Sequence, residues 1–185
     1  SATMLTFATL AMSAGSRLKM AAKERAPAAI SPASFCGQDS TPSTMEEAIE
    51  PLWYLTKDGD RTCLALFSRH YSARKQGATL FAGPGDRIIL RTDAGDAMYV
   101  WRAERYRFDA QEGINCAIFR NESPHRSSEL IRQADAIADH VWPGERHYTF
   151  VDPQAVRSSN PGFCFIAAGW RKCGFTKGGL LILER

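Results

Sequence analysis

The sequence predicts an α/β protein of the α+β kind, in which helices flank one mixed β-sheet. Three observations lead to this prediction. Short apolar segments are bounded by Gly, Pro and Asp turns, and two stretches have the 3.6-residue period of an amphipathic helix. The composition is that of an ordinary globular protein, since 44% of the 185 residues are hydrophobic and 23% are charged. This composition excludes a disordered chain, collagen and a coiled-coil rod.

Residues 1–45 differ from the rest of the chain and are expected to form an N-terminal arm or extension. They are rich in Ala, Ser, Thr and Pro. The folded domain is expected over residues 46–185. No apolar run in the chain approaches the roughly 20 residues that a membrane span requires, so no membrane partner is expected.

The domain is expected to begin with a strand and a helix. Residues 51–56 are aromatic and apolar and run into a Lys-Asp-Gly-Asp turn, which is typical of a strand end. Residues 61–71 carry apolar side chains at helical spacing, and Asp60 precedes them as a candidate N-cap. A strand followed by a capped helix is therefore predicted.

The next three segments are predicted to be strands. Residues 87–91 and 97–101 are separated by an Asp-Ala-Gly-Asp turn, so they are expected to form an antiparallel hairpin. Residues 114–119 are almost wholly apolar, as a central strand covered on both faces would be.

The last third of the chain gives the clearest helix. Apolar side chains from Leu130 to Val141 lie on one helical face about four turns long. Ser127 or Ser128 is predicted to cap this helix, and Pro143-Gly144 follows its end.

A strand, a short helix and a closing strand are expected to complete the domain. Residues 147–151 form the strand. Asn160-Pro161 is expected to cap a short helix that runs to Ala168, and residues 180–183 form the closing strand. The predicted order is strand, helix, three strands, helix, strand, helix, strand.

This order, over roughly residues 50–185, resembles the GNAT (N-acetyltransferase-like) superfamily. The stretch from Asn160-Pro-Gly-Phe163 to Gly169-Trp170 and Cys173-Gly-Phe175 is similar to the superfamily's late helix, which starts near an Asn and ends in Gly-Phe. The resemblance implies a GNAT-like mixed sheet and a transferase activity.

Four short motifs resemble a narrower group, the phage Mom-like DNA modification proteins. They are Phe67-Ser-Arg-His-Tyr-Ser72, Phe119-Arg-Asn-Glu122, Tyr148-Thr-Phe-Val-Asp152, and Asn160-Pro-Gly162 with Ala168-Gly-Trp170. The resemblance implies an enzyme that transfers a carbamoylmethyl or acyl-type group to the exocyclic amine of adenine in double-stranded DNA. Such a modification protects phage DNA from restriction in the cytoplasm of the host. The resemblance also implies a requirement for iron.

The residues that match these motifs are the candidate catalytic residues His70, Tyr71, Tyr148 and Asp152, and His70 and Asp152 are the candidate iron ligands. As a histidine, His70 can act as a base or as a metal ligand near neutral pH, although histidine is also favoured at a helix C-terminus. Asp152 ends a strand, where ligands of α/β sheets gather, but an Asp before Pro is also common in turns. Tyr148 has the competing interpretation of strand packing. Glu122 is a candidate base for an amine or a solvated loop charge.

The segment where acetyl-CoA enzymes carry a glycine-rich loop departs from that pattern. Residues 120–128 contain no glycine, and Pro124 removes one backbone donor. The N-terminus of the helix at Ser127 and Ser128, with Arg126, still offers an anion site for a group donor. The candidate cofactor-binding residues are therefore Arg126, Ser127, Ser128 and Asn160. The donor is acetyl-CoA or another acyl or aminoacyl donor.

Basic side chains concentrate in the middle of the chain. The net charge is +3, and residues 61–110 hold nine basic and five acidic side chains. Arginines alternate there with aromatic residues, a combination suited to phosphate contact and base stacking, although a solvated hairpin has the same pattern. The candidate nucleic-acid-binding residues are Arg74, Lys75, Trp101, Arg102, Arg105 and Arg107.

The five cysteines are expected to be reduced. Their number is odd and no C-x-x-C pair occurs, which disfavours a disulfide scaffold and a zinc knuckle. Cys63, Cys116 and Cys164 lie among apolar neighbours, as small buried side chains of a cytoplasmic protein do. Cys173 lies beside two basic residues, which are expected to lower the pKa of its thiol.

Two other functions are consistent with the same residues. One is an acetyl-CoA-dependent N-acetyltransferase that acts on a small amine or a protein. The other is a DNA-binding protein that keeps the fold without catalysis, for which salt-sensitive binding is the expected property.

Overall fold

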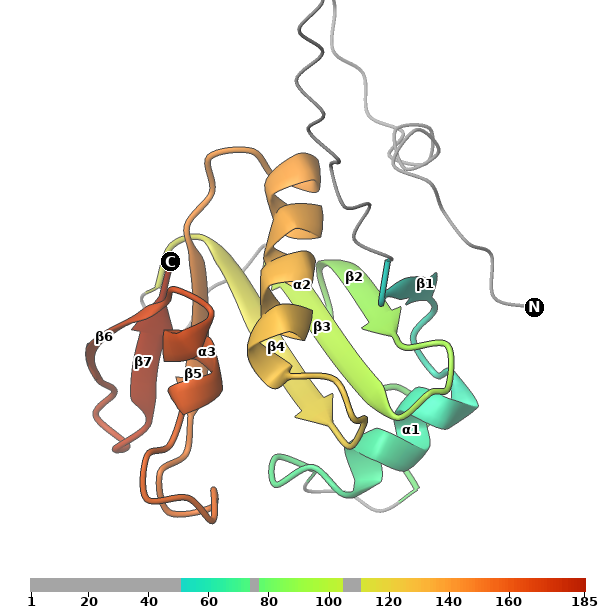
Figure 1. Cartoon of the computed structure of the whole chain (residues 1–185), viewed down its shortest axis with the longest axis horizontal. Helices are drawn as coiled ribbons and strands as arrows, with labels where there is room; N and C mark the ends of the chain where they lie inside the picture. Colours follow the sequence, from blue (N-terminus) through green and yellow to red (C-terminus); the bar gives the residue numbers. More distant parts are fainter. Residues whose placement is uncertain (1–50, 74–76, 105–110) are drawn as a thin grey trace, which may run out of the picture. The chain divides into compact units, whose positions relative to one another are not determined.

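Seven strands form one mixed sheet in the order β1-β2-β3-β4-β5-β7-β6 (Figure 1). The computed structural model describes residues 51–73, 77–104 and 111–185. The predicted N-terminal arm, residues 1–45, lies outside the described residues. The prediction of a mixed sheet flanked by helices is confirmed.

The first half of the sheet is antiparallel. Its elements are β1 (Tyr54–Thr56), α1 (Arg61–Ser68), β2 (Asp86–Arg91), β3 (Ala97–Ala103) and β4 (Ile114–Asn121). The predicted hairpin of β2 and β3 is confirmed, and β1 and β4 pair on either side of it. Asp60 is the N-cap of α1, as predicted, because its carboxylate accepts from the N–H groups of Thr62 and Cys63, each at 3.0 Å.

The second half begins with a parallel crossover. Its elements are α2 (Ser127–Val141), β5 (His147–Val151), α3 (Phe163–Ala167), β6 (Arg171–Phe175) and β7 (Leu181–Glu184). The crossover through α2 sets β5 parallel to β4. β7 then pairs antiparallel with β5 on one side and with β6 on the other, so β6 is an edge strand.

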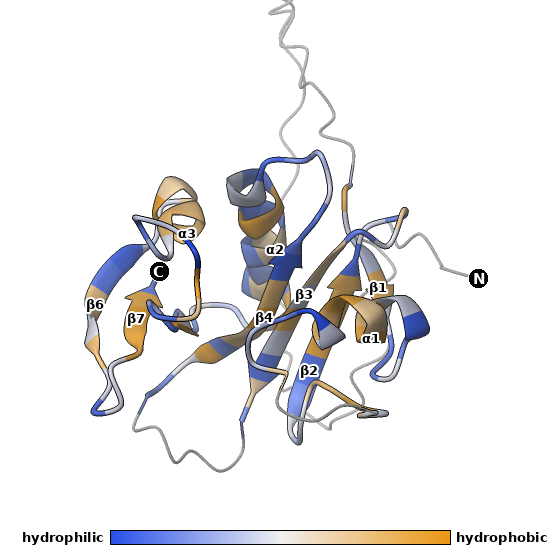
Figure 2. Ribbon diagram, turned by 90° about the horizontal axis from the view of Figure 1, so that it is seen from below, coloured by the Kyte–Doolittle hydropathy of each residue, from blue (hydrophilic) through white to orange (hydrophobic). Residues whose placement is uncertain are grey.

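Helices lie on both faces of the sheet (Figure 2), and apolar side chains are buried on each face. On one face, Cys63 and Leu66 of α1 pack with Ile89, Val100 and Ile118 of the sheet. The other face carries the larger core, in which α2 and α3 cover strands from β2 to β7. Because both faces are covered, residues 114–119 of β4 are apolar except for Asn115, close to what the sequence predicts.

Three indole N–H groups fix α2 to the rest of the domain. Trp53 donates to the carbonyl of Leu130 at 2.8 Å, and Trp101 donates to the carbonyl of Ala134 at 2.9 Å. The third indole, that of Trp170, donates to the carboxyl of Asp135 at 2.9 Å. All these side chains are buried, so each bond satisfies a donor that would otherwise be costly to bury.

The boundaries of two helices differ from the predictions. The N-cap of α2 is Arg126, and Ser127 is already helical, so the predicted Ser cap is wrong. The N-cap of α3 is Gly162 rather than Asn160. Gly162 has φ 79°, and a Cβ there would lie 2.6 Å from a methyl carbon of Leu183, so the close approach to β7 requires glycine.

One strand was not predicted from the sequence. β6 is exposed along its whole length and lacks the apolar alternation of a half-buried strand. Pairing with β7 makes it a strand, and Arg171 supports the pairing through an ion pair of 2.8 Å with Glu184. Of the described helices, none has the length and apolar character that crossing a bilayer requires.

Replacing Trp170 with Phe is expected to lower the free energy of unfolding by about 2 kcal/mol, because a buried carboxyl oxygen of Asp135 loses its donor. Urea unfolding measures the change. Trp142→Phe, at the C-cap of α2, is the matched control for loss of ring volume and is expected to cost less. Equal losses in the two variants would show that the hydrogen bond to Asp135 contributes nothing.

Candidate functional site

β4 and β5 are hydrogen-bonded over only part of their lengths. Their register covers three pairs, which end at Cys116 with Thr149, where the Thr149 hydroxyl donates to the Cys116 carbonyl at 2.9 Å. β4 then continues to Asn121 and β5 to Val151 without pairing with each other, and the two strands separate (Figure 1). The carboxyl ends of a parallel pair are thus open, which is where α/β sheets commonly bind ligands.

The chain segment that follows α1 contacts both separated strands. We call residues 70–72 the 70–72 turn; it is closed by hydrogen bonds of 2.8 Å from His70 N–H to the Phe67 carbonyl and 3.0 Å from Ala73 N–H to the His70 carbonyl. The rings of His70 and Tyr71 stack with centroids 4.4 Å apart. The first of these two residues faces β4 and the second faces β5.

His70 is held as a neutral imidazole. The backbone N–H of Ser72 donates to its Nδ1 at 3.2 Å, so Nδ1 is the unprotonated nitrogen, and the Ser72 hydroxyl lies 2.7 Å from the same atom. Burial, together with the positive charge of Arg120, lowers the pKa of His70 to about 4. The Phe119 carbonyl, which accepts from the ring, acts in the opposite direction. At neutral pH the ring therefore has a lone pair available toward Ser72.

Tyr71 carries the contact to β5. Its hydroxyl donates to the carbonyl of Phe150 at 3.4 Å, and the backbone of Asp152 is also within hydrogen-bonding reach of it. Partial burial raises the pKa of Tyr71, so the phenol keeps its proton at neutral pH. Because Tyr71 stacks on His70, the structure brings the predicted residues His70, Tyr71 and Asp152 to the same opening.

An ion-pair network fixes the 70–72 turn to β4. Glu122 pairs with Arg69 at 2.6 Å and with Arg120 at 2.6 Å, and Arg120 also donates to the Arg69 carbonyl at 2.6 Å. The bonds from Arg69 and Arg120 lower the pKa of Glu122 to about 2. A carboxylate this acidic is a poor proton acceptor, which disfavours Glu122 as a base, and its ion pairs connect the 70–72 turn to β4.

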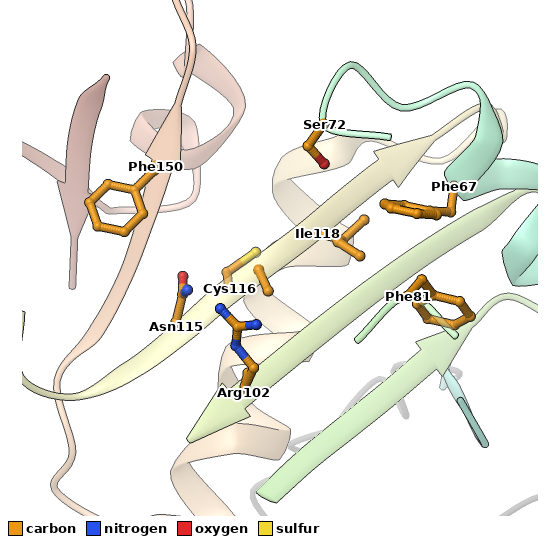
Figure 3. A pocket seen from close by; sticks show the side chains of 9 residues that line it. Phe67, Ser72, Phe81, Arg102, Asn115, Cys116, Ile118 and Phe150 are labelled. Atoms are coloured by element: carbon orange, nitrogen blue, oxygen red, sulfur yellow. The ribbon is translucent and has the colours of Figure 1, made fainter. Parts of the chain in front are cut away.

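A pocket of about 300 Å³ lies on the α1 face, against the separated strands (Figure 3). Phe67 and Phe81 form one side of it and Phe150 the other. Its polar lining consists of Ser72, Arg102 and Asn115. The remaining lining residues are Cys116, Ala117 and Ile118 of β4. Sequence analysis missed Ser72 and Asn115. The signal for Asn115 is an amide in an otherwise apolar strand, and Ser72 stands two residues after a candidate histidine.

Tyr148 and Asp152 have structural partners of their own. Tyr148 is fully buried, and its ring packs edge-on against Phe150 and beneath Arg146, whose guanidinium carbon is 5.3 Å from the ring centre. These contacts favour the packing interpretation of Tyr148. The Asp152 carboxylate accepts from the N–H groups of Gln154 at 2.9 Å and Ala155 at 3.3 Å, which is the turn-forming interaction of an Asp before Pro.

The arrangement around His70 and Asp152 does not fit an iron centre. Both ring nitrogens of His70 have hydrogen-bond partners, and one carboxylate oxygen of Asp152 caps a turn. Within the ranges that the structure describes, no group of three or more His, Cys, Asp or Glu side chains is placed to hold a metal ion. The residues present at His70 and Asp152 therefore do not fit the iron that the resemblance implies.

The loop before α2 directs its polar groups inward. The Ser123 N–H donates to the Asn121 side chain at 2.9 Å, and the His125 N–H donates to the Ser123 hydroxyl at 3.2 Å. The Asn121 amide also donates to the Ser127 hydroxyl at 3.0 Å. These N–H groups are therefore engaged within the loop, unlike those of a glycine-rich phosphate loop. Standard CoA binding at this loop is disfavoured.

The remaining candidate cofactor residues are exposed or partly exposed. Arg126 is exposed, and Ser128 lies in the first turn of α2. Asn160 is exposed on the loop before α3, where its side-chain oxygen lies 3.5 Å from the Lys172 ammonium. Donor binding by these residues stays a prediction.

The structure describes only two of the six residues predicted to bind nucleic acid, Trp101 and Arg102. Arg74, Lys75, Arg105 and Arg107 lie outside the described residues. Trp101 has no exposed surface and its ring packs against those of His147 and Trp170, so the prediction that it contacts DNA is wrong. A strand aromatic that faces α2 is core, whatever its neighbours in sequence. Arg102 is partly buried, pairs with Glu104 and lines the pocket.

The described cysteines are free thiols. Burial raises the pKa of Cys63 to about 12 and also raises those of Cys116 and Cys164, in agreement with the interpretation as inert side chains. Cys173 is exposed, yet its thiol pKa is raised, by desolvation and by Glu184, more than Arg146 lowers it. The expectation of a lowered pKa at Cys173 is wrong.

No protein-family model, curated protein or solved structure matches the chain. Function is therefore inferred from the contacts of the 70–72 turn and from the pocket that Ser72 lines. Both belong to the α1 face of the sheet.

Replacing His70 with Gln is expected to flatten the pH dependence of stability between pH 6.5 and 4. In the wild type, the unfolded imidazole takes up a proton below pH 6.5, whereas the folded one stays neutral until about pH 4. The unfolded state binds more protons in this window, so stability falls as pH falls, by at most about 3 kcal/mol for a pKa that drops from 6.5 to about 4, and by less because solvent screens the partly exposed ring. Urea midpoints at five pH values measure it. His140→Gln, an exposed control, is expected to keep the wild-type slope; equal slopes in all three proteins would contradict the burial of His70.

Replacing Glu122 with Gln is expected to destabilise the protein slightly at pH 7 and not at pH 2. The folded pKa is depressed from 4.5 to about 2, so the stabilisation is complete above pH 4.5 and disappears as pH falls through about 2. The effect is small because the ion pairs are exposed and screened. Thermal melts across this range, with Glu145→Gln as the control for one lost charge, measure it. A deficit that persists at pH 2 would rule out the ion pairs as its source.

Proposed function

We propose that this protein is a group-transfer enzyme of GNAT-like architecture that modifies an amine at the opening between β4 and β5. The amine that the resemblance implies is the exocyclic amine of adenine in double-stranded DNA. The observation that carries the proposal is the 70–72 turn, which presents a neutral imidazole and a protonated phenol at the separated ends of two parallel strands.

The arrangement of the sheet supports the likeness on which the proposal rests. The hairpin followed by a strand–helix–strand–helix–strand unit is present, with β6 added between α3 and β7. The strand separation lies between β4 and β5, the one parallel pair among the described strands, and α2 begins beside the same ends. A donor placed between β4 and β5 would have its reactive group within reach of the α1 face.

The chemistry of transfer needs one proton acceptor and one proton donor. The amine nitrogen forms a bond to the electrophilic carbon of the donated group, and the bond from this carbon to the leaving group breaks. Attack makes the nitrogen positively charged and acidic, so its proton passes to the Ser72 hydroxyl while the Ser72 proton passes to His70 Nδ1, 2.7 Å away. Tyr71 keeps its proton at neutral pH and can give it to the leaving group.

The low pKa of His70 suits this sequence of events. An imidazole with a pKa of about 4 is unprotonated at neutral pH and ready to accept. It is a weak base, and therefore it accepts only from the acidic nitrogen formed on attack, not from the free amine. Once the product leaves, His70 gives its proton to water, and Tyr71, whose pKa is raised, takes a proton back from water.

Modified nucleosides in DNA test the proposal. The full chain is expressed in bacteria with iron-replete medium, and their DNA is digested and analysed by mass spectrometry for a modified deoxyadenosine. The wild type is expected to produce it. His70→Gln and Tyr71→Phe are expected to reduce the yield at least tenfold, since acid–base groups contribute about 10²–10⁴ in rate. His140→Gln and Tyr54→Phe are the matched controls.

Two results would contradict the proposal. Unmodified deoxyadenosine in cells that contain the folded protein would exclude DNA as the acceptor. A large rise in melting temperature with CoA, together with acetylation of small amines from acetyl-CoA, would favour the acetyltransferase function instead, since only a ligand of the native state stabilises it.

A further inference from the structure

Asn115 is the most unusual residue of the pocket. It lies on β4 between Ile114 and Cys116, with only 5% of its surface exposed. Its side-chain oxygen is buried and has no hydrogen-bond partner among the residues that the structure describes. A buried acceptor without a donor costs about 1–3 kcal/mol, and a β-branched apolar residue would suit this strand better. Folding alone therefore does not explain an amide here.

Arg102 lies beside Asn115 and also has a buried polar atom without a hydrogen-bond partner among the described residues. The two residues are register partners on β3 and β4, so their side chains share the face that α1 covers. The guanidinium pairs with Glu104 and contacts the Ala82 carbonyl, yet its Nε is buried without a partner within the described ranges. An unused acceptor and an unused donor thus lie side by side at one end of the pocket (Figure 3).

The aromatic residues of the lining favour a flat ligand. Phe67 and Phe81 on one side and Phe150 on the other bound a cavity of about 300 Å³. Aromatic walls stack on flat rings, and a cavity of this size holds a bicyclic ring. A flexible aliphatic ligand would fill the space, but it would leave the polar groups of Asn115 and Arg102 unpaired.

We propose that this pocket binds a planar nitrogen heterocycle and that Asn115 is the residue that selects it. The Asn115 oxygen accepts from an N–H of the ring's amino substituent, its NH₂ group donates to the adjacent ring nitrogen, and Arg102 Nε donates to a further acceptor. An asparagine amide makes such a paired contact with a ring edge that carries a donor next to an acceptor. The inference deepens the proposed function, on which it rests, because the amino substituent held here is the amine to be modified.

Sites built in this way reject a ligand that lacks the matching group. When the ligand has no N–H to give, the Asn115 oxygen stays buried and unpaired, so the loss of affinity includes the cost of that unpaired atom. The binding preference for the amino substituent should therefore disappear when Asn115 is replaced, whereas contact with the Phe side chains would persist.

A pair of neutral nucleosides tests the inference with the full chain. Adenosine and purine riboside share a bicyclic ring and a sugar and differ in the amino substituent. Affinities are measured by ligand-observed NMR titration, which requires no group transfer. The wild type is expected to bind adenosine at least tenfold more tightly than purine riboside. Asn115→Val is expected to bind the two equally, at the affinity that the wild type has for purine riboside.

The variants also report on folding. Asn115→Val removes an unpaired buried acceptor from a strand, so its melting temperature is expected to equal or exceed that of the wild type. Arg102→Gln is expected to weaken adenosine binding about threefold to tenfold. Arg87→Gln, at the register position beside Arg102 but outside the pocket, is the matched control and is expected to bind as the wild type does.

Three results would overturn the inference: no adenosine binding at millimolar concentration, equal binding of both nucleosides by the wild type, or unchanged discrimination in Asn115→Val. None of them depends on catalysis. A failure here is therefore distinguishable from failure of the proposed function, which is read from nucleosides of cellular DNA and from the His70 and Tyr71 variants.

Discussion

The separation of β4 from β5 is the constraint on which the rest of the site depends. A parallel pair that stops hydrogen-bonding at Cys116 and Thr149 leaves later backbone groups of both strands in need of other partners. The 70–72 turn supplies two of them, through the His70 ring to the Phe119 carbonyl and through the Tyr71 hydroxyl to the Phe150 carbonyl. The same contacts that satisfy the strands bring the two polar rings to the opening, so structure and chemistry share one set of bonds.

Local signals in the sequence were sufficient to predict most of the secondary structure. The period of α2, the Asp60 cap and the turn between β2 and β3 each act within a few residues, and each was predicted. β6 was not, because its exposed side chains have no period and only its distant partner β7 makes it a strand. The prediction of Asn160 as the cap of α3 was wrong for a related reason, since the approach of Leu183 to Gly162 is a tertiary contact.

The site was predictable only in part. His70, Tyr71 and Asp152 were chosen from motifs, and the fold does bring them to one opening. Trp101 was misassigned because the side of the sheet that a strand residue faces depends on its register, and Trp101 faces α2. Asn115 carried a readable signal, an amide in an apolar strand, but its meaning needs the cavity and the unpaired oxygen that only the folded chain shows.

The site exists only if the 70–72 turn spans the two separated strands, and nuclear Overhauser effects in the full chain test this arrangement most directly. Contacts are predicted between the His70 and Tyr71 rings and between the Tyr71 ring and the protons of Phe150, since the rings stack 4.4 Å apart and the Tyr71 hydroxyl reaches the Phe150 carbonyl. A Tyr71 ring with contacts only to its neighbours in sequence would contradict the claim, and with it the proposed site.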